Sequence, residues 1–271
     1  MDAARWLWRR TLPPAVRAAL RRWARDLPHR LRDAIPDLRE RLTGAVPLPP
    51  ARLRARVGLN SSRREFLEIG GNAAGDILGA VAEAGGLARE SDRWLDFGCG
   101  SGRVARHLIG ASGSRRLTGV DVDRGAIAWC SRHLPGDFRA IGPKPPLSDL
   151  PGSYDRICAV SVLTHMDEPA QRVWIAELRR LLRVGGLLIV TTHSPDLTWT
   201  RPDLTDAQRR DLSDAGFLFA PAAGPFNDSS TFQSEEYLRR AWAPALSLRL
   251  FRRFGLGGYQ DLSVWERPPG P

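Results

Sequence analysis

The pattern of apolar and polar positions changes character near residue 58. From there on, stretches with apolar residues three or four positions apart alternate with short, nearly continuous apolar runs. The first pattern predicts amphipathic helices and the second predicts buried strands. The predicted strands are 93–97, 116–121, 138–141, 154–160, 186–192, 246–252 and 260–266, and the predicted helices are 66–86, 102–110, 124–133, 168–182, 205–214 and 234–242.

Alternation of helix and strand is typical of a parallel sheet covered by helices on both faces. We therefore predict an α/β fold for residues 58–271, with a Rossmann-like, doubly wound sheet of about seven strands that is mostly parallel. The last two strands lie close enough in the sequence to pair as a C-terminal antiparallel hairpin. Glycine and proline in residues 220–230 predict a loop between the last two helices.

Residues 1–57 follow a different pattern, in which prolines interrupt short helical repeats and so predict an N-terminal helical arm. The arm is strongly basic, because residues 1–56 hold 14 Arg and 5 acidic residues of the chain's 40 basic and 30 acidic ones, a balance of +9 out of +10. Trp23 lies on the apolar side of a repeat with Val16, Leu20 and Leu27. Such helices fit either an anionic membrane surface or a protein surface, contacted through residues 1–45.

Composition narrows the class of protein further. The chain of 271 residues is 42% hydrophobic, and no apolar run approaches the roughly 20 residues of a membrane-spanning helix. Arg9 and Arg10 follow Trp6-Leu7-Trp8, so no signal-peptide core forms. The three cysteines fit neither a disulfide framework nor metal-ligand spacing. We expect no metal site and a cytoplasmic location, with the arm allowing association with the inner membrane surface.

The strongest chemical signal is the run from Asp96 to Gly102, which joins a predicted strand to a predicted helix and has glycines at three alternate positions. Glycine permits positive φ and lets a ligand approach the backbone, and a helix N-terminus presents free N–H groups. A second acid, Asp121, ends the next strand, 19 residues after Gly102. In dinucleotide-binding folds an acid at that point binds the hydroxyls of a ribose.

Two kinds of cofactor fit such a loop. Nicotinamide dinucleotides are bound by G-x-G-x-x-G, whose third glycine lets helix and strand pack closely. Arg103 occupies that third position, which disfavours an NAD-type oxidoreductase. An acid followed by G-x-G-x-G instead resembles motif I of class I S-adenosylmethionine (SAM)-dependent methyltransferases. Together with Asp121 and the strand order, the resemblance extends over residues 58–267.

The resemblance implies SAM as the cofactor and gives roles to individual residues. Asp96 would lie near the methionine end of the cofactor, and Asp121 would bind the ribose. No acid that could contact the adenine follows the third strand in residues 140–143, so backbone atoms would make that contact. We expect Cys99 to pack within the loop and not to act as a nucleophile. The further cofactor-binding residues implied are Phe97, Gly98, Cys99, Gly100, Gly102, Val122 and Ser161.

His165 and His193 follow the fourth and fifth predicted strands, at the edge where open α/β sheets bind ligands. Methyl transfer is a displacement that depends on alignment, and a hydroxyl acceptor must also lose its proton. An imidazole can take that proton at neutral pH, so both histidines are candidate catalytic residues and His165 is the first choice. The alternative is that either ring only holds a neighbouring loop by a hydrogen bond.

The sequence indicates the methyl acceptor less specifically than it indicates the cofactor. Enzymes that methylate base amines carry (D/N)-P-P-(Y/F) where this chain reads AVSV in residues 159–162, and the Pro-Cys pair of cytosine-C5 enzymes is absent, so no specific nucleic acid is expected. The run SVLTH in residues 161–165 and the Gln260-Asp261 pair resemble methyltransferases of bacterial glycan and secondary-metabolite pathways. This implies a small-molecule or glycan acceptor, methylated at a hydroxyl oxygen. The alternative is a non-catalytic SAM-binding partner protein.

Residues 217–242 carry six aromatic side chains after the fifth strand. Loops on rigid scaffolds often bind ligands, but aromatic side chains also fill cores. The region therefore either lines an acceptor site or forms a small separate core. The residues are Phe217, Phe219, Phe226, Phe232, Tyr237 and Trp242.

Overall fold

The computed structural model describes residues 46–57, 62–112, 116–150, 152–222, 228–243 and 245–270. The chain divides into two compact units, residues 1–66 and 67–271. The described part of the first unit holds the short helix α3 (Ala51–Arg54), where the Arg54 guanidinium donates to the Pro49 carbonyl over 2.6 Å. The helices predicted in residues 1–45, and their predicted membrane or protein contact, lie outside the described residues.

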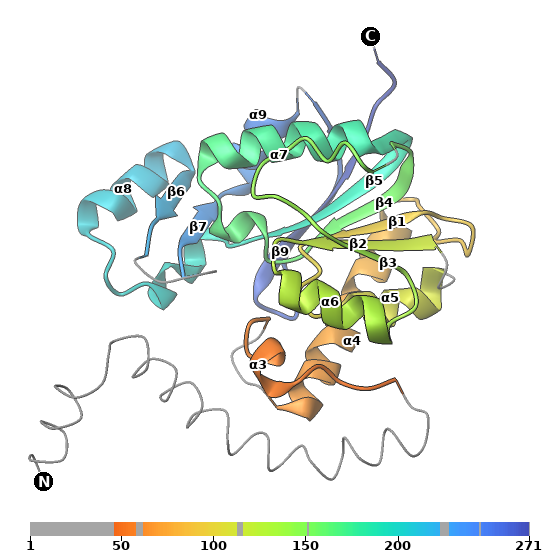
Figure 1. The fold of residues 1–271 in the computed structure, drawn as a ribbon. Coiled ribbons are helices and arrows are strands. Elements are labelled where there is room, and N and C mark those ends of the chain that lie inside the picture. The colour runs from red at the N-terminus through yellow and green to blue at the C-terminus, as the bar shows by residue number, and fades with distance from the viewer. Residues whose placement is uncertain are drawn as a thin grey trace, which may run out of the picture. The chain divides into compact units, whose positions relative to one another are not determined.

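The second unit is built on a sheet to which the described residues contribute seven strands. They are β1 (Trp94–Phe97), β2 (Leu117–Asp121), β3 (Asp137–Ala140), β4 (Tyr154–Ala159), β5 (Leu182–Thr192), β8 (Ser247–Leu256) and β9 (Gln260–Glu266). Their order is β3-β2-β1-β4-β5-β9-β8, as Figure 1 shows. β1 to β5 are parallel, and β9 runs antiparallel between β5 and β8. The predicted Rossmann-like sheet with a C-terminal antiparallel pair is confirmed.

Helices cover both faces of this sheet (Figure 1). On one face lie α4 (Arg63–Glu83), α5 (Ala105–Ser112) and α6 (Arg124–His133), and on the other α7 (Glu168–Leu181) and α9 (Glu235–Trp242). Side chains on β1 alternate between the two cores: Trp94 packs toward the first group of helices, and Leu95 and Phe97 pack toward α7. The alternation leaves Asp96 on the face of α5 and α6, beside Cys158 of β4.

Acidic and hydroxyl side chains fix where the helices begin. Asp123 caps α6 by accepting from Gly125 N and Ala126 N, and Asp167 caps α7 by accepting from Ala170 N. α6 starts where it was predicted to start. α5 begins at Ala105, later than predicted, because the residues that follow the glycine loop form turns before the helix.

A small lobe follows β5 and consists of η3 (Pro195–Thr200), α8 (Asp206–Ala215), β6 (Phe217–Ala220) and β7 (Ser230–Gln233). β6 and β7 form an antiparallel pair that the sequence analysis did not predict, since four-residue strands are too short to show alternation. Phe232 lies in the core of this lobe with Leu197, Leu212 and Leu218.

The six aromatic residues of the region 217–242 do not form one group. Phe232 belongs to the core of the small lobe, whereas Tyr237 and Trp242 belong to the core between the sheet and α7. Phe217 packs against Tyr237 with ring centroids 5.0 Å apart. Phe226 lies outside the described residues. Of the two predicted roles, filling a core describes most of these side chains.

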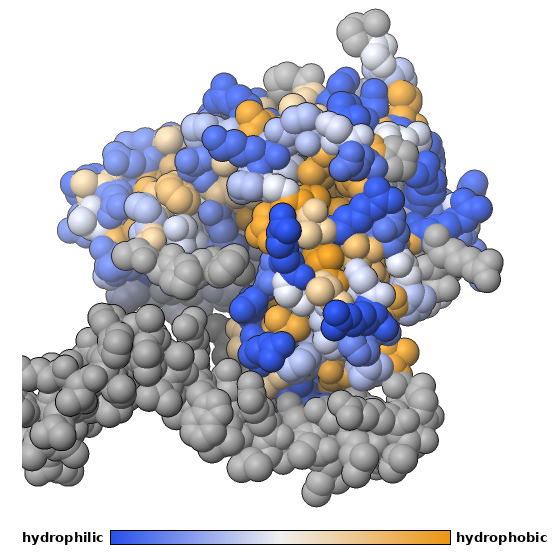
Figure 2. Space-filling view, in the orientation of Figure 1, coloured by the Kyte–Doolittle hydropathy of each residue, from blue (hydrophilic) through white to orange (hydrophobic). Residues whose placement is uncertain are grey.

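Among the described residues, no helix is long and apolar enough to cross a membrane. No group of three or more His, Cys, Asp and Glu side chains in the same residues is arranged to hold a metal ion. In the face drawn in Figure 2, hydrophilic residues are spread widely, with apolar residues exposed between them.

Candidate active site

The loop after β1 adopts a conformation that requires glycine. Gly98, Gly100 and Gly102 have φ angles of +78°, +52° and +77°, in the left-handed region that L side chains rarely adopt. A Cβ atom on Gly98 would collide with Val162 Cγ2, and one on Gly102 would collide with Leu134 Cδ1. The loop is therefore a backbone cradle, closed on one side by the segment that follows β4.

Asp121 ties this loop to the end of β2. Its Oδ2 accepts from Gly100 N and its Oδ1 accepts from Asp123 N, both over 2.8 Å. A carboxylate has further lone pairs after two such bonds, so it can still accept hydroxyl groups of a ribose. The next residue, Val122, is 46% exposed and gives an apolar surface beside that carboxylate.

Asp96 is almost completely buried, and one of its oxygens lacks a partner. Oδ1 accepts from the Cys158 thiol over 3.6 Å, whereas Oδ2 has no hydrogen-bond partner among the described residues. Burial, with a smaller contribution from Asp121, raises the pKa of Asp96 to about 7, and the hydrogen bond from the Cys158 thiol and then Arg103 act in the opposite direction. A buried acid with an unpartnered oxygen is suited to receive a hydrogen-bond donor from a ligand.

Phe97 and Cys99 turn their side chains away from the cradle. The Phe97 ring packs in the core against Trp174 with centroids 4.7 Å apart. The Cys99 thiol is buried and points to the Gly100 carbonyl over 3.8 Å, and burial raises its pKa well above the usual value. Cys99 therefore remains a thiol, as expected for packing, and only the backbone of these two residues is available to a ligand.

Ser161 forms a strained turn after β4. Its φ of +56° is left-handed, a conformation that costs a non-glycine residue on the order of 1–3 kcal/mol. Thr191 Oγ1 of β5 accepts from Ser161 N over 2.8 Å, and Ser161 Oγ accepts from the Gln260 side chain over 2.6 Å. These contacts hold the turn so that the adjacent Val162 lies against the glycine loop.

His165 ends the short helix η2 (Leu163–His165), which follows that turn. Its Nδ1 lies 2.7 Å from the Ser229 carbonyl, which can only accept, so Nδ1 carries the ring proton and Nε2 keeps its lone pair. Burial lowers the pKa of His165, while the Ser229 carbonyl and Asp228 act in the opposite direction. The ring is therefore neutral at pH 7.

His193 follows β5, and its ring stands edge-on to that of His165 with centroids 6.4 Å apart. Burial, and then the neighbouring His165, lower its pKa to about 4. The rings of Phe232 and Tyr259 lie 5.8 Å and 6.0 Å from it. Both predicted histidines thus lie in one cluster of rings and are neutral together at pH 7.

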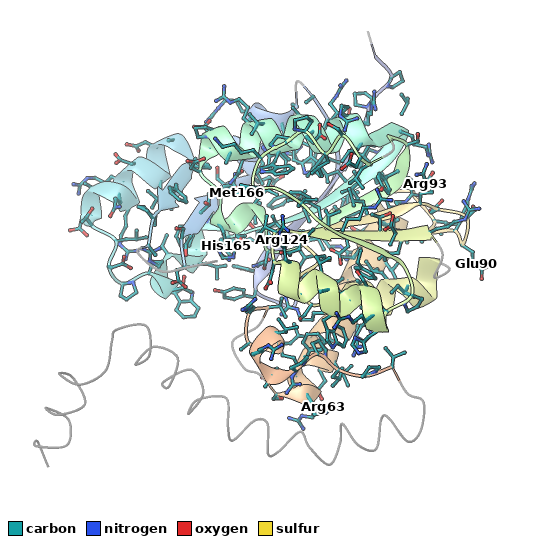
Figure 3. All side chains as sticks on the ribbon, viewed as in Figure 1. Arg63, Glu90, Arg93, Arg124, His165 and Met166 are labelled. Atoms are coloured by element: carbon teal, nitrogen blue, oxygen red, sulfur yellow. The ribbon has the colours of Figure 1, made fainter. Side chains whose placement is uncertain are left out.

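The small lobe is fastened to this cluster by polar contacts. Gln233 N donates to the His193 carbonyl over 2.8 Å, and Thr231 Oγ1 donates to the Met166 carbonyl over 2.6 Å. In Figure 3, His165 and Met166 lie at one end of the sheet and Arg93, just before β1, at the other. The glycine loop after β1 and the histidines after β4 and β5 therefore lie at the carboxyl ends of the parallel strands, where open α/β sheets bind their ligands.

Sequence reasoning missed three residues of this cluster: Ser229, Tyr259 and the side-chain role of Gln260. Ser229 acts through its carbonyl, so its side chain gives no signal. Tyr259 and Gln260 lie about 100 residues from Ser161 in the chain, and only their place at the tip of the β8–β9 hairpin brings them near. The Gln260-Asp261 pair was the one local signal.

Comparison with known proteins gives a consistent result. A family model described as a methyltransferase domain matches residues 23–245. A ubiquinone biosynthesis O-methyltransferase of Pseudomonas aeruginosa is 27% identical over 117 residues, which cover 41% of this chain and 48% of the relative. The chain thus spans about half the length of the first curated relatives that it matches.

Two solved structures show the same fold. A SAM-dependent methyltransferase from Methanosarcina mazei has a TM-score of 0.52 at 20% identity, covering 67% of this chain and 95% of its own. The 1,6-didemethyltoxoflavin-N1-methyltransferase of Burkholderia thailandensis, solved with S-adenosylhomocysteine (SAH), has a TM-score of 0.51 at 18% identity, covering 75% and 80%.

Proposed function

The chain belongs to the methyltransferase domain family, and we propose that it is a class I SAM-dependent methyltransferase that methylates a hydroxyl oxygen of a small-molecule or glycan acceptor. The O-methyltransferase name of the relative from Pseudomonas aeruginosa supports an oxygen acceptor. The structural neighbour from Burkholderia thailandensis is named for N1 methylation, so the fold is compatible with other acceptors.

The residues around the glycine loop fit the cofactor. Asp121 would hold the ribose, and the backbone of the loop would approach the cofactor where side chains are excluded by Val162 and Leu134. The unpartnered Oδ2 of Asp96 would accept from the ammonium group at the methionine end, and the exposed Val122 would contact the adenine. When bound, SAM supplies a methyl group on a positively charged sulfur, which a nucleophile can displace.

One observation carries the choice of a hydroxyl acceptor: His165 donates from Nδ1 to a backbone carbonyl and so keeps Nε2 unprotonated at pH 7. A hydroxyl is a weak nucleophile until its proton is taken, and a neutral imidazole beside it can take that proton. An amine with a free lone pair does not need such a base. His165 is therefore the proposed general base.

The other groups of the cluster would orient the acceptor. Tyr259 is 42% exposed and its ring lies 6.0 Å from that of His193 between centroids, so it offers a ring surface to the acceptor, whereas Phe232 supports His193 from the core of the small lobe. His193 would contact the acceptor as a neutral ring. Its pKa of about 4 makes it the weaker of the two bases.

The experiment is methyl transfer from labelled SAM to a panel of phenols, sugars, amines and thiols, with NMR of each product to find the methylated atom. We expect the wild-type protein to methylate oxygen. Methylation at nitrogen alone would contradict the proposal. The alternative, a non-catalytic SAM-binding partner protein, would be favoured by a different result. In that case the protein binds SAM but transfers its methyl group to no acceptor class and does not hydrolyse SAM in a single-turnover experiment.

A further inference from the structure

A single amide group connects the turn after β4 to the end of β5. Gln260, the first residue of β9, donates from Nε2 to Ser161 Oγ over 2.6 Å and to His193 Nε2 over 3.2 Å. The side chain is 6% exposed, so water does not compete for these bonds. Gln260 therefore bridges a residue beside the glycine loop and a residue of the histidine cluster.

The chemistry of the amide fixes the state of His193. An NH₂ group only donates, so the ring nitrogen that faces it must have a free lone pair, and His193 then carries its proton on Nδ1, which has no hydrogen-bond partner among the described residues. A second proton at Nε2 would break the bond to Gln260 and leave a second donor of the same ring unpaired, which is costly. The contact thus favours the neutral ring.

The state of His193 matters for its neighbour. A proton that His165 takes from an acceptor creates a cation 6.4 Å from the His193 ring, measured between centroids. Two positive imidazoles at that distance in a buried site would repel each other strongly. The other titratable groups that face the pair are Asp228, which favours a charged His165, and Tyr259, whose ring lies edge-on to His193.

The hairpin that carries Gln260 is held in place independently of the histidines. Its tip donates from Gly257 N to Asp76 of α4 over 2.8 Å, and Phe254 N donates to Asp261 over 2.8 Å. Tyr259 N closes the turn on the Leu256 carbonyl over 3.1 Å. The amide is therefore presented from a fixed support.

We propose that Gln260 is a positioning residue for methyl transfer: by donating to His193 and Ser161 it keeps His193 neutral, so that the acceptor's proton passes to His165. This inference rests on the proposed role of His165 as base. Gln260 is not proposed to contact the acceptor or the cofactor. It affects methyl transfer through Ser161 and His193, the two residues that it bridges.

The test uses nitrogen NMR of the histidine rings at neutral pH in the full chain. In the wild type, His193 Nε2 is expected to give the signal of an unprotonated ring nitrogen. In Gln260→Glu the donor becomes an acceptor of the same size, so Nε2 is expected to become protonated. In Gln260→Leu we expect kcat to fall about tenfold, the rate equivalent of one lost hydrogen bond, with SAH affinity unchanged.

Glu177→Leu is the matched control, because Glu177 of α7 is also 6% exposed and its side chain accepts from Leu147 N over 2.7 Å and from Arg180, not from either imidazole. It should lower Tm about as much as Gln260→Leu and leave the His193 signals unchanged. A purely structural Gln260 would make the two leucine variants alike in both readouts, which would overturn the inference.

The NMR result separates this inference from the proposed function. A protonated His193 Nε2 in the wild type, or no change in Gln260→Glu, overturns the role of Gln260 even if oxygen is methylated. Full turnover in His165→Ala overturns the proposed base, and with it the catalytic purpose of the bridge, while the tautomer assignment stands.

Discussion

The glycine loop and the histidine cluster lie at the same end of one sheet but are assembled from the chain in different ways. The loop comes from contiguous residues, Asp96 to Gly102, and its partners in the sheet lie on the two neighbouring strands, Val120 and Asp121 of β2 and Cys158 of β4. The cluster draws on η2, the end of β5, β7 and the tip of the β8–β9 hairpin. The two regions touch where Val162 lies against Gly98.

The difference explains what each region does. The shape of the loop depends on its glycines and on the adjacent strand β2, so it can stay the same while more distant segments change. A cluster built from distant segments changes whenever one of them changes, which suits the acceptor side of an enzyme family. If the two regions are independent in this way, variants should affect either cofactor affinity or turnover, but not both.

The largest expected effect is that of His165→Ala on turnover. Loss of a general base lowers kcat by about 10²–10⁴-fold. SAH affinity, measured by calorimetry on the same preparation, should stay within experimental error. His133→Ala is the control, because His133 also bonds through Nδ1 to a backbone carbonyl but lies exposed at the end of α6. A matching loss of SAH affinity would break the separation of the two regions.

Asp96→Asn should separate stability from binding. The pKa of Asp96 is about 7 in the folded protein against 3.8 for the ordinary group. Below pH 3.8 the acid is protonated in both the folded and the unfolded chain and does not affect the free energy of unfolding. Between pH 3.8 and 7 only the unfolded chain loses the proton, so the folded protein becomes progressively less stable as pH rises. Above pH 7 the asparagine variant should be more stable in urea unfolding, by at most about 4 kcal/mol. SAH affinity should fall. Equal free energies of unfolding for the wild type and the variant at pH 8 would show that burial does not raise the pKa of Asp96.

Asp121→Ala should affect the cofactor alone. Hydrogen bonds to a charged group contribute about 1.5–3 kcal/mol, so the Kd for SAH should rise by about 10- to 100-fold. At saturating SAM, kcat should be close to that of the wild type. Asp137→Ala, which removes an exposed carboxylate from β3, serves as the control. A large fall in kcat at saturation would place Asp121 in the chemistry as well.

The smallest effect should come from Tyr259. Its ring is 42% exposed and lies edge-on to His193, and an aromatic contact of this kind contributes about 1 kcal/mol. Tyr259→Ala should therefore raise the acceptor KM about fivefold, while Tyr259→Phe should keep it. Trp199→Ala, in the small lobe and 69% exposed, is the comparison for loss of a surface ring. Equal KM values in Tyr259→Ala and the wild type would remove Tyr259 from the acceptor side.

The two regions also differ in how far the sequence predicts them. The main sheet and its helices were predicted because apolar runs and helical spacing are local signals, and α6 has the predicted bounds, with Asp123 capping its first turn. The glycine loop was predicted for the same reason. β6 and β7 were missed because four residues carry no periodicity, and they bring Thr231 and Phe232 to the histidines.

His165 and His193 were found by their place after two strands, but their states were not. The proton position on His165 depends on a carbonyl 64 residues away, and that on His193 depends on an amide 67 residues away. Such contacts follow from tertiary packing and leave no pattern along the chain. The residues proposed to contact the acceptor likewise come from segments that are far apart in the chain.

The pH dependence of kcat at saturating SAM and acceptor shows most clearly whether His165 is the group that takes the proton. Because burial lowers the pKa of His165 from 6.5, the neutral base is present at and above pH 7. We predict a plateau there and a tenfold fall in kcat per pH unit below the lowered pKa of His165, and we predict that this fall is absent in His165→Ala. A profile that stays flat toward pH 4, or a fall that survives in His165→Ala, would contradict this role of His165.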